Sequence, residues 1–224
     1  NLHCFSALLE LPPPKFKLTI DSIIWAIKHT MRDIADTGLN ICLELLNNIA
    51  NTDPAMAGAF FQQYLLNILQ DIFYVLTDSD HKSGFKTQCL LLARIYELIE
   101  TDKVIVPLWD PAQIPDPNMN NRLFIRQYTA NLLRTAFPHV QPQYIEQFVN
   151  GLCSLSSDLA QYKVHLRDFL ITSREVAGGS DNSDLFLEDK EAEQQRRIAE
   201  ERENAAKIPG MLKPSQIVEE DEEL

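Results

Sequence analysis

The feature that most constrains the fold is a pair of apolar stripes in residues 16–50, each with the period of an α-helix. The first stripe contains Phe16, Ile20, Ile23, Ile24, Ile27 and Met31. The second contains Ile34, Gly38, Ile41, Leu45 and Ile49, and is widened by Leu39, Cys42, Leu43 and Leu46. A helix that is apolar over so much of its circumference must be covered on two sides. The pattern predicts paired helices that pack on neighbouring pairs, which is typical of an α-solenoid.

The same pattern recurs to about residue 177. Residues 55–76 are apolar on two opposite faces, which predicts a helix buried on both. Further helices are expected from Lys15 to Met31 and at about 85–99, 120–137, 144–155 and 159–170. In the helix at 120–137, the packed face is expected to be the one that carries Phe124, Tyr128, Leu132 and Ala136. The predicted fold is all-α: a solenoid of HEAT-type helical hairpins, followed by a separate C-terminal helix and an acidic tail.

Polar residues and prolines mark where several helices begin. Pro54 is expected at the first helical position, with Thr52 or Asp53 as the N-cap, because proline has no amide hydrogen to lose there. Asp33 or Asp36 is the candidate cap of the helix after Met31; in the alternative, residues 32–36 are themselves helical and only bend the chain.

The two tryptophans have different surroundings in the sequence. Trp25 lies within a predicted helix and is expected to pack between helices. Trp109 lies in an irregular stretch, where prolines at 107, 111, 115 and 117 exclude a helix. It is interpreted as either a hydrophobic staple or an exposed contact residue.

Charge and glycine content divide the end of the chain from the rest. The predicted division is HEAT repeats in 1–177, a glycine-containing linker in 178–183, a C-terminal helix in 184–208 and an acidic tail in 209–224. Residues 181–224 carry −8 of the net charge of −12. Such a chain repels nucleic acid, and an electrostatic partner of this segment should be basic.

The sequence indicates no catalytic, cofactor or metal site, and the chain is not expected to be an enzyme. Nucleotide-binding glycine motifs and metal-binding histidine motifs are absent from it. The four cysteines are widely spaced and are interpreted as core residues of a reducing compartment. Apolar runs are too short for a membrane span, which predicts a soluble protein. The first residues, from Asn1, look like the end of a helix and predict a piece of a longer protein.

Five segments are distinctive in their letters and in their order. They are DSIIWAIKHTMRDIADTGL (21–39), AFPH (136–139), HLRDFL (165–170), SDLFLE (183–188) and IPG (208–210). These segments resemble the C-terminal end of the nuclear export receptors of the importin-β superfamily, and the resemblance extends over essentially the whole chain. The proline-rich loop at 104–118 is longer than that family's pattern, and the acidic tail matches it in charge but not in letters.

The resemblance implies a ring-shaped HEAT solenoid that shuttles between nucleus and cytoplasm. Such a receptor carries proteins with leucine-rich export signals through nuclear pores together with GTP-bound Ran. Implied partners are Ran, cargo that binds outside this fragment, Ran-binding accessory proteins and nucleoporins, with no direct nucleic acid or membrane partner. This part would close the ring.

The resemblance also implies a regulatory role for the last segment, which would lower the affinity of the empty receptor for cargo and Ran. The expected anchors of the helix are Leu185, Phe186 and Leu187, and the expected acidic tail residues are Glu219, Glu220, Asp221, Glu222 and Glu223. The alternative interpretation is a HEAT-type scaffold or regulatory subunit of another complex, with no transport role.

Overall fold

The computed structural model describes residues 2–78, 84–179 and 181–206. Contacts divide the chain into two units, Asn1–Leu185 and Phe186–Leu224. The helices of the first unit are α1 (Leu2–Leu9), α2 (Pro13–Ile27), α3 (Arg32–Ile49), α4 (Pro54–Thr77), α5 (Phe85–Glu100), α6 (Asn121–Ala136), α7 (Pro142–Ser154) and α8 (Leu159–Val176). A 3₁₀ turn, Ser183–Phe186, leads to α9 (Leu187–Ala206).

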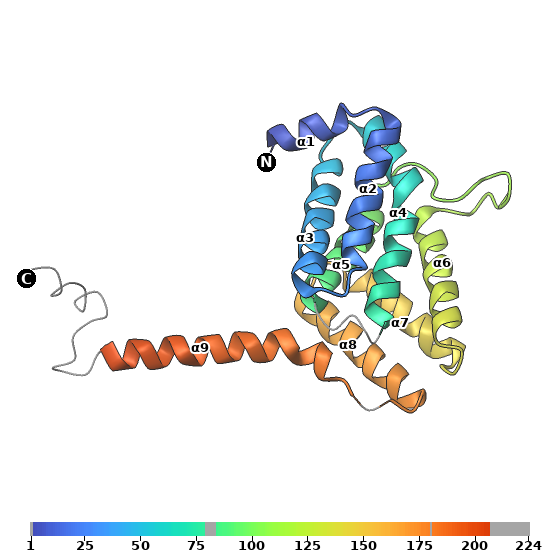
Figure 1. Ribbon diagram of the computed structural model, residues 1–224. Coiled ribbons are helices and arrows are strands. Elements are labelled where there is room, and N and C mark those ends of the chain that lie inside the picture. The colour runs from blue at the N-terminus through green and yellow to red at the C-terminus, as the bar shows by residue number, and fades with distance from the viewer. Residues whose placement is uncertain (1, 79–83, 180, 207–224) are drawn as a thin grey trace, which may run out of the picture. The chain divides into compact units, whose positions relative to one another are not determined.

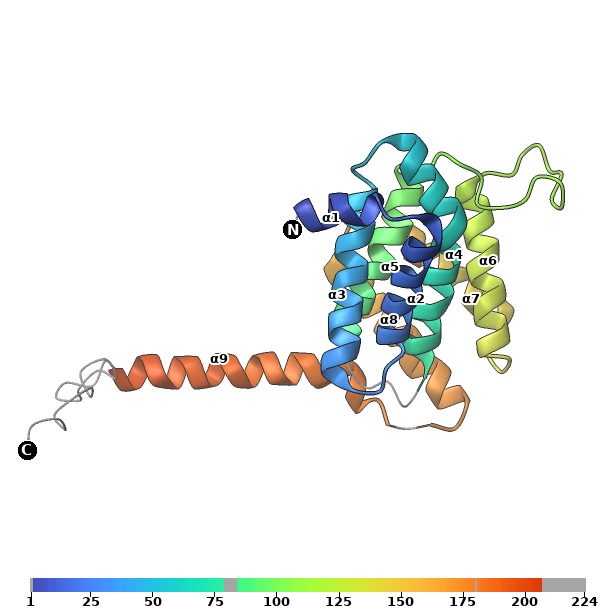
Figure 2. The same ribbon diagram turned by 45° about the horizontal axis from the view of Figure 1, so that its top comes forward.

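The first unit is an all-α solenoid of packed helical hairpins, which confirms the predicted fold class (Figure 1). Helices α2 and α3, α4 and α5, and α6 and α7 form consecutive pairs, and α8 packs on α5 and α7. Figure 2 shows α2, α4 and α6 side by side, with α5 and α7 behind them. Because α5 contacts α3, α4, α6, α7 and α8, it is the central helix of the stack.

Burial explains why α4 and α5 hold this stack together. The apolar residues of α4 are buried on both of its faces, as the sequence predicted, including Phe60, Leu65 and Leu69. In α5, Leu91, Leu92, Ile95 and Leu98 are fully inaccessible to solvent, and such a side chain contributes roughly 1.5–3 kcal/mol by its burial.

The beginning of α4 confirms the predicted cap, and the beginning of α3 does not. The Asp53 carboxylate accepts hydrogen bonds from the amides of Ala55 and Met56, and Pro54 occupies the first helical position. In α3 the N-cap is Met31, without a side-chain bond, so neither Asp33 nor Asp36 is the cap, and residues 32–36 are helical as in the alternative. The helix begins early enough that both aspartates lie inside it, with Asp33 in the first turn, where a negative charge is favoured.

The prediction that Trp25 packs between helices was also wrong. Its side chain is 62% exposed, and Met31 and Ile41 are 59% and 47% exposed. Helix α2 ends at Ile27, four residues earlier than expected, so Met31 lies beyond it. The buried face of α2 is formed by Ile20, Ile23 and Ile27, and Trp25 lies off that face.

In α6 the packed face is displaced by one residue from the predicted face. Its buried residues are Ile125, Thr129, Ala130 and Leu133. Phe124 and Tyr128 are half-buried, and the Trp109 ring lies 5.8 Å from that of Phe124. The loop therefore supplies an aromatic cover for this second face, which favours the hydrophobic staple interpretation of Trp109.

The base of the proline-rich loop is held by one side chain of α6. Asn121 donates hydrogen bonds through Nδ2 to the carbonyl oxygens of Val104 (2.7 Å) and Val106 (2.9 Å). Its Oδ1 accepts one from the Leu108 amide at 3.0 Å. These two carbonyl groups and one amide lie outside helices, and Asn121 supplies their hydrogen-bond partners. The loop therefore has a fixed path where it leaves α5.

Cys42, Cys89 and Cys153 are free and buried, which confirms their interpretation as core residues. Burial raises the pKa of the Cys42 thiol to about 12, and burial is also the main reason that the pKa of Cys153 rises to about 12. Both thiols are therefore protonated at neutral pH and are poor nucleophiles. The side chain of Cys4 lies outside the described residues.

Candidate functional site

The candidate site is the C-terminal end of the first unit, formed by α8, the glycines that follow it and the residues up to Leu185. It begins with α8, whose N-cap Asp158 accepts a hydrogen bond from the Gln161 amide. Tyr162, Leu166, Phe169 and Leu170 form its buried face. This face holds α8 on α5 and α7, so its C-terminal end is a fixed platform.

His165 contributes to that platform through its contacts with α7. Its Nε2 lies 2.9 Å from the carbonyl oxygen of Phe148 on α7, and the two rings are stacked. A Cβ on Gly151 would lie 2.1 Å from the same Nε2, so a glycine is needed where the imidazole crosses α7.

The end of α8 is closed by the two glycines of the predicted linker. Gly178 has a φ of +84°, in the left-handed region that favours glycine. The amide of Gly179 donates a 2.8 Å hydrogen bond to the carbonyl oxygen of Arg174. This six-residue bond beside a left-handed glycine is the Schellman arrangement, which satisfies carbonyl groups at the end of a helix.

The same arginine binds the chain beyond the linker through its side chain. The guanidinium nitrogens of Arg174 donate to the two carboxylate oxygens of Asp184 at 2.7 and 2.9 Å. The side chains are only 18% and 13% exposed. A two-pronged pair of this kind is stronger and more directional than a single charged hydrogen bond.

The three predicted anchors occupy different environments. Leu185 is 3% exposed and belongs to the first unit, whereas Phe186 and Leu187 are half-buried and belong to the second. Their anchoring role remains a prediction. Arg174 and Asp184 were missed by sequence reasoning, since their only signal is opposite charge ten positions apart, across two glycines.

Helix α9 is polar around its whole circumference beyond its first turns. Residues 192–203 are exposed, and Arg196 pairs with Glu193 at 2.8 Å and with Glu200 at 3.9 Å. Glu188 and Asp189 lie in the first turn, where negative charge favours the helix. These features stabilise a solvated helix. Residues 207–224, with the IPG segment and the tail from Glu219 to Glu223, lie outside the described residues.

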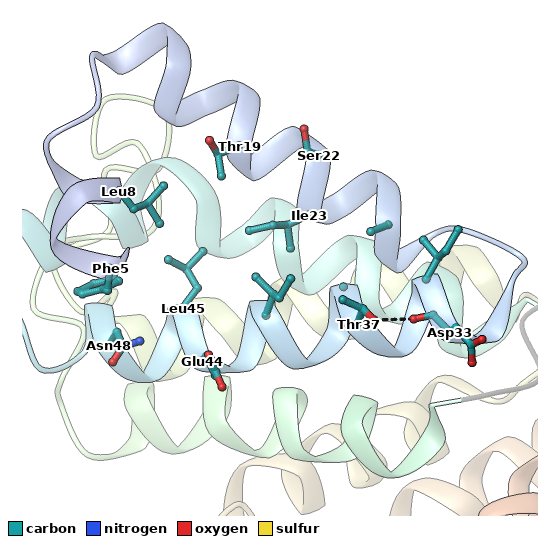
Figure 3. A pocket seen from close by; sticks show the side chains of 14 residues that line it. Phe5, Leu8, Thr19, Ser22, Ile23, Asp33, Thr37, Glu44, Leu45 and Asn48 are labelled. Carbon is teal, nitrogen blue, oxygen red and sulfur yellow. Dashed lines mark hydrogen bonds between the residues drawn. The ribbon is translucent and has the colours of Figure 1, made fainter. Parts of the chain in front are cut away.

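Apart from this site, a groove with a volume of about 680 Å³ lies between α2 and α3 and is bordered by α1 (Figure 3). Ile23 and Leu45 line it, and Phe5 and Leu8 of α1 lie at one end. At the other end the Thr37 hydroxyl donates to the Asp33 carbonyl oxygen at 2.6 Å. The lining is mainly apolar, so the groove offers packing area to another helix.

Within 2–78, 84–179 and 181–206, no group of three or more His, Cys, Asp or Glu residues is arranged to hold a metal ion. None of the described helices combines the length and apolar character that crossing a bilayer requires.

Comparison with known proteins places this architecture in a family. Residues 1–178 match the family model described as CRM1 C terminal. The chain is 53% identical to Exportin-1 of Schizosaccharomyces pombe over 223 residues, which is 100% of this chain and 20% of that protein. It is 44% identical to Exportin-1 of Drosophila melanogaster over 224 residues (98% and 20%), and 43% identical to Protein EXPORTIN 1B of Arabidopsis thaliana over 214 residues (96% and 19%).

The chain thus spans about a fifth of the length of these relatives. The matched region ends at the glycines that close α8, so it coincides with the helical solenoid. The resemblance that was drawn from five short segments is confirmed by a match over the full chain. This chain belongs to the CRM1 C-terminal family.

Proposed function

We propose that this chain is the C-terminal part of a nuclear export receptor. The receptor carries proteins with leucine-rich export signals through nuclear pores together with GTP-bound Ran, and so shuttles between nucleus and cytoplasm. The observation that carries the proposal is the match of residues 1–178 to the CRM1 C-terminal family. The names of the relatives support it, and an all-α solenoid supports it because stacked repeats form extended protein-binding surfaces.

Within that receptor, the solenoid unit closes the ring, and the cargo groove lies outside this chain. The last segment, a linker (178–183), a C-terminal helix (184–208) and an acidic tail (209–224), lowers the affinity of the empty receptor for cargo and Ran. Leu185, Phe186 and Leu187 anchor the helix. The net charge of −8 on residues 181–224 supports a basic docking surface elsewhere in the receptor.

The mechanism is a two-state equilibrium. With the helix docked the receptor has low affinity, and cargo with Ran shifts the population toward the state in which the helix is displaced. The size of the shift is limited by the difference in the helix's affinity for the two states. Accessory Ran-binding proteins and nucleoporins act on the same complex, without direct nucleic acid or membrane contact.

Assembly of the export complex distinguishes this function from a HEAT-type scaffold without a transport role. In full-length receptor, we expect a leucine-rich signal peptide and GTP-bound Ran each to tighten binding of the other by the same factor, because linkage is reciprocal. Titration calorimetry of each ligand with and without the other measures that factor. Binding of neither ligand, or binding without coupling, would support the scaffold instead.

A further inference from the structure

The segment Ser183–Leu185 lies on the solenoid side of the junction although it follows the glycine linker in sequence. We propose that Arg174, Asp184 and Leu185 form a latch that holds this segment on the solenoid and places the hinge of the C-terminal helix after Leu185. The hinge is then not the Gly178–Gly179 pair that the sequence indicates. The consequence for the receptor rests on the proposed function of that helix.

The ion pair is the first component of the latch. Both oxygens of the Asp184 carboxylate are bound by the Arg174 guanidinium, and neither side chain is more than 18% exposed. By contrast, Arg134 and Glu146 between α6 and α7 form a 2.7 Å pair whose side chains are 40% and 57% exposed. Exposed pairs contribute little, whereas loss of one partner of a shielded pair leaves a charge with reduced solvation.

The second component is the burial of Leu185, which is 3% exposed. Two local hydrogen bonds hold the backbone that leads to it. The Ser183 amide donates to the Asp181 carboxylate at 3.0 Å, and the Leu185 amide donates to the Asn182 carbonyl oxygen at 3.2 Å. A buried apolar side chain thus follows the charged residue directly in sequence, so charge and burial act on consecutive residues.

The third component is the fixed conformation of the glycine pair. Gly178 is held in the left-handed region, and the Gly179 amide binds the carbonyl oxygen of Arg174 at 2.8 Å. Arg174 therefore closes α8 through its backbone and holds Asp184 through its side chain. With both ends of the linker fixed by one residue, motion of α9 begins at Phe186, where the second unit begins.

The latch determines how long the tether of the helix is. When it is closed, the helix leaves the solenoid immediately after Leu185. When it is open, residues 178–185 join the tether, and a longer flexible tether lowers the effective concentration of the helix at its docking surface. The closed latch therefore strengthens the restraint that the helix exerts on the empty receptor.

Hydrogen exchange of full-length receptor tests the latch without reference to cargo. Asp184→Ala and Arg174→Met each remove one partner, and we expect amide exchange of peptides covering 183–185 to become at least about tenfold faster in both. Exchange of α5 should not change. Glu146→Gln, which breaks the exposed pair with Arg134, should leave 183–185 as in the parent. Equal exchange of 183–185 in the parent and both variants would overturn the latch.

Affinity for a fluorescent leucine-rich signal peptide, without Ran, tests the consequence. We expect Asp184→Ala to tighten binding about threefold, by the weaker tethering of the helix. Removal of residues 186–224 should tighten it more, and Asp184→Ala should add nothing in that shortened receptor. If the deletion tightens binding but Asp184→Ala does not, the hinge assignment is wrong. If the deletion has no effect while exchange still responds to Asp184→Ala, the latch stands and the proposed function fails.

Discussion

Replacing Phe169 by alanine is expected to destabilise the chain by about 3–5 kcal/mol, a large part of the stability of a typical domain. Phe169 is 2% exposed and stacks on Phe148 with ring centroids 3.7 Å apart. Tyr144 and Phe137 contribute further ring contacts at 5.7 and 5.5 Å. One side chain thus joins α8, α7 and the end of α6, and its removal leaves a cavity among them.

Urea unfolding of the 224-residue chain, followed by circular dichroism, measures this loss as a lower midpoint at an unchanged slope. Trp25→Ala is the matched control, because it also removes a large aromatic side chain. Trp25 is 62% exposed, so its replacement should change stability by no more than about 0.5 kcal/mol. Equal losses for the two variants would contradict the assignment of the core.

Gly38→Ala is expected to destabilise the chain by about 1–2 kcal/mol, although alanine is the better helix former by about 1 kcal/mol. A Cβ at this position would lie 2.8 Å from the Ile27 amide nitrogen and 2.9 Å from the Ala26 Cβ. Because these atoms belong to the backbone and first side-chain carbon of α2, α2 and α3 must separate to make room.

Asn40→Ala provides the control for Gly38→Ala, since Asn40 is exposed in the same helix and its replacement changes helix propensity without crowding α2. We expect a gain of a few tenths of a kcal/mol there. Differential scanning calorimetry of the two variants gives the comparison. A Gly38→Ala chain as stable as Asn40→Ala would show that α2 and α3 do not meet as closely as described.

Most of the solenoid was predictable because helix periodicity and caps are local signals. The two-sided burial of α4 follows from its own sequence, and so does the cap by Asp53. Periodicity does not say which of two apolar stripes a neighbour covers. Phe124 was therefore assigned to the packed face of α6, which buries Ile125 instead. In α2 the predicted stripe with Ile27 is buried, but Trp25 was also expected to be covered and is not.

The candidate site was only half predictable from sequence. The amino-acid sequence around Leu185 indicated that the segment after the glycines is distinctive. It did not indicate that Arg174 binds Asp184. That ion pair joins residues ten positions apart, and no local pattern in the sequence predicts that they meet. Likewise, the glycines look like a flexible joint in sequence, while the left-handed Gly178 makes them the end of α8.

In the proposed function, the residues after the solenoid hold the receptor in a state of low cargo affinity. The most direct measurement is the dissociation constant of a leucine-rich signal peptide for full-length receptor without Ran, compared with receptor lacking residues 186–224. This cut retains Leu185, so the end of the solenoid is undisturbed. Typical coupling between sites predicts binding at least about fivefold tighter after the deletion. An unchanged or weaker affinity would contradict the claim.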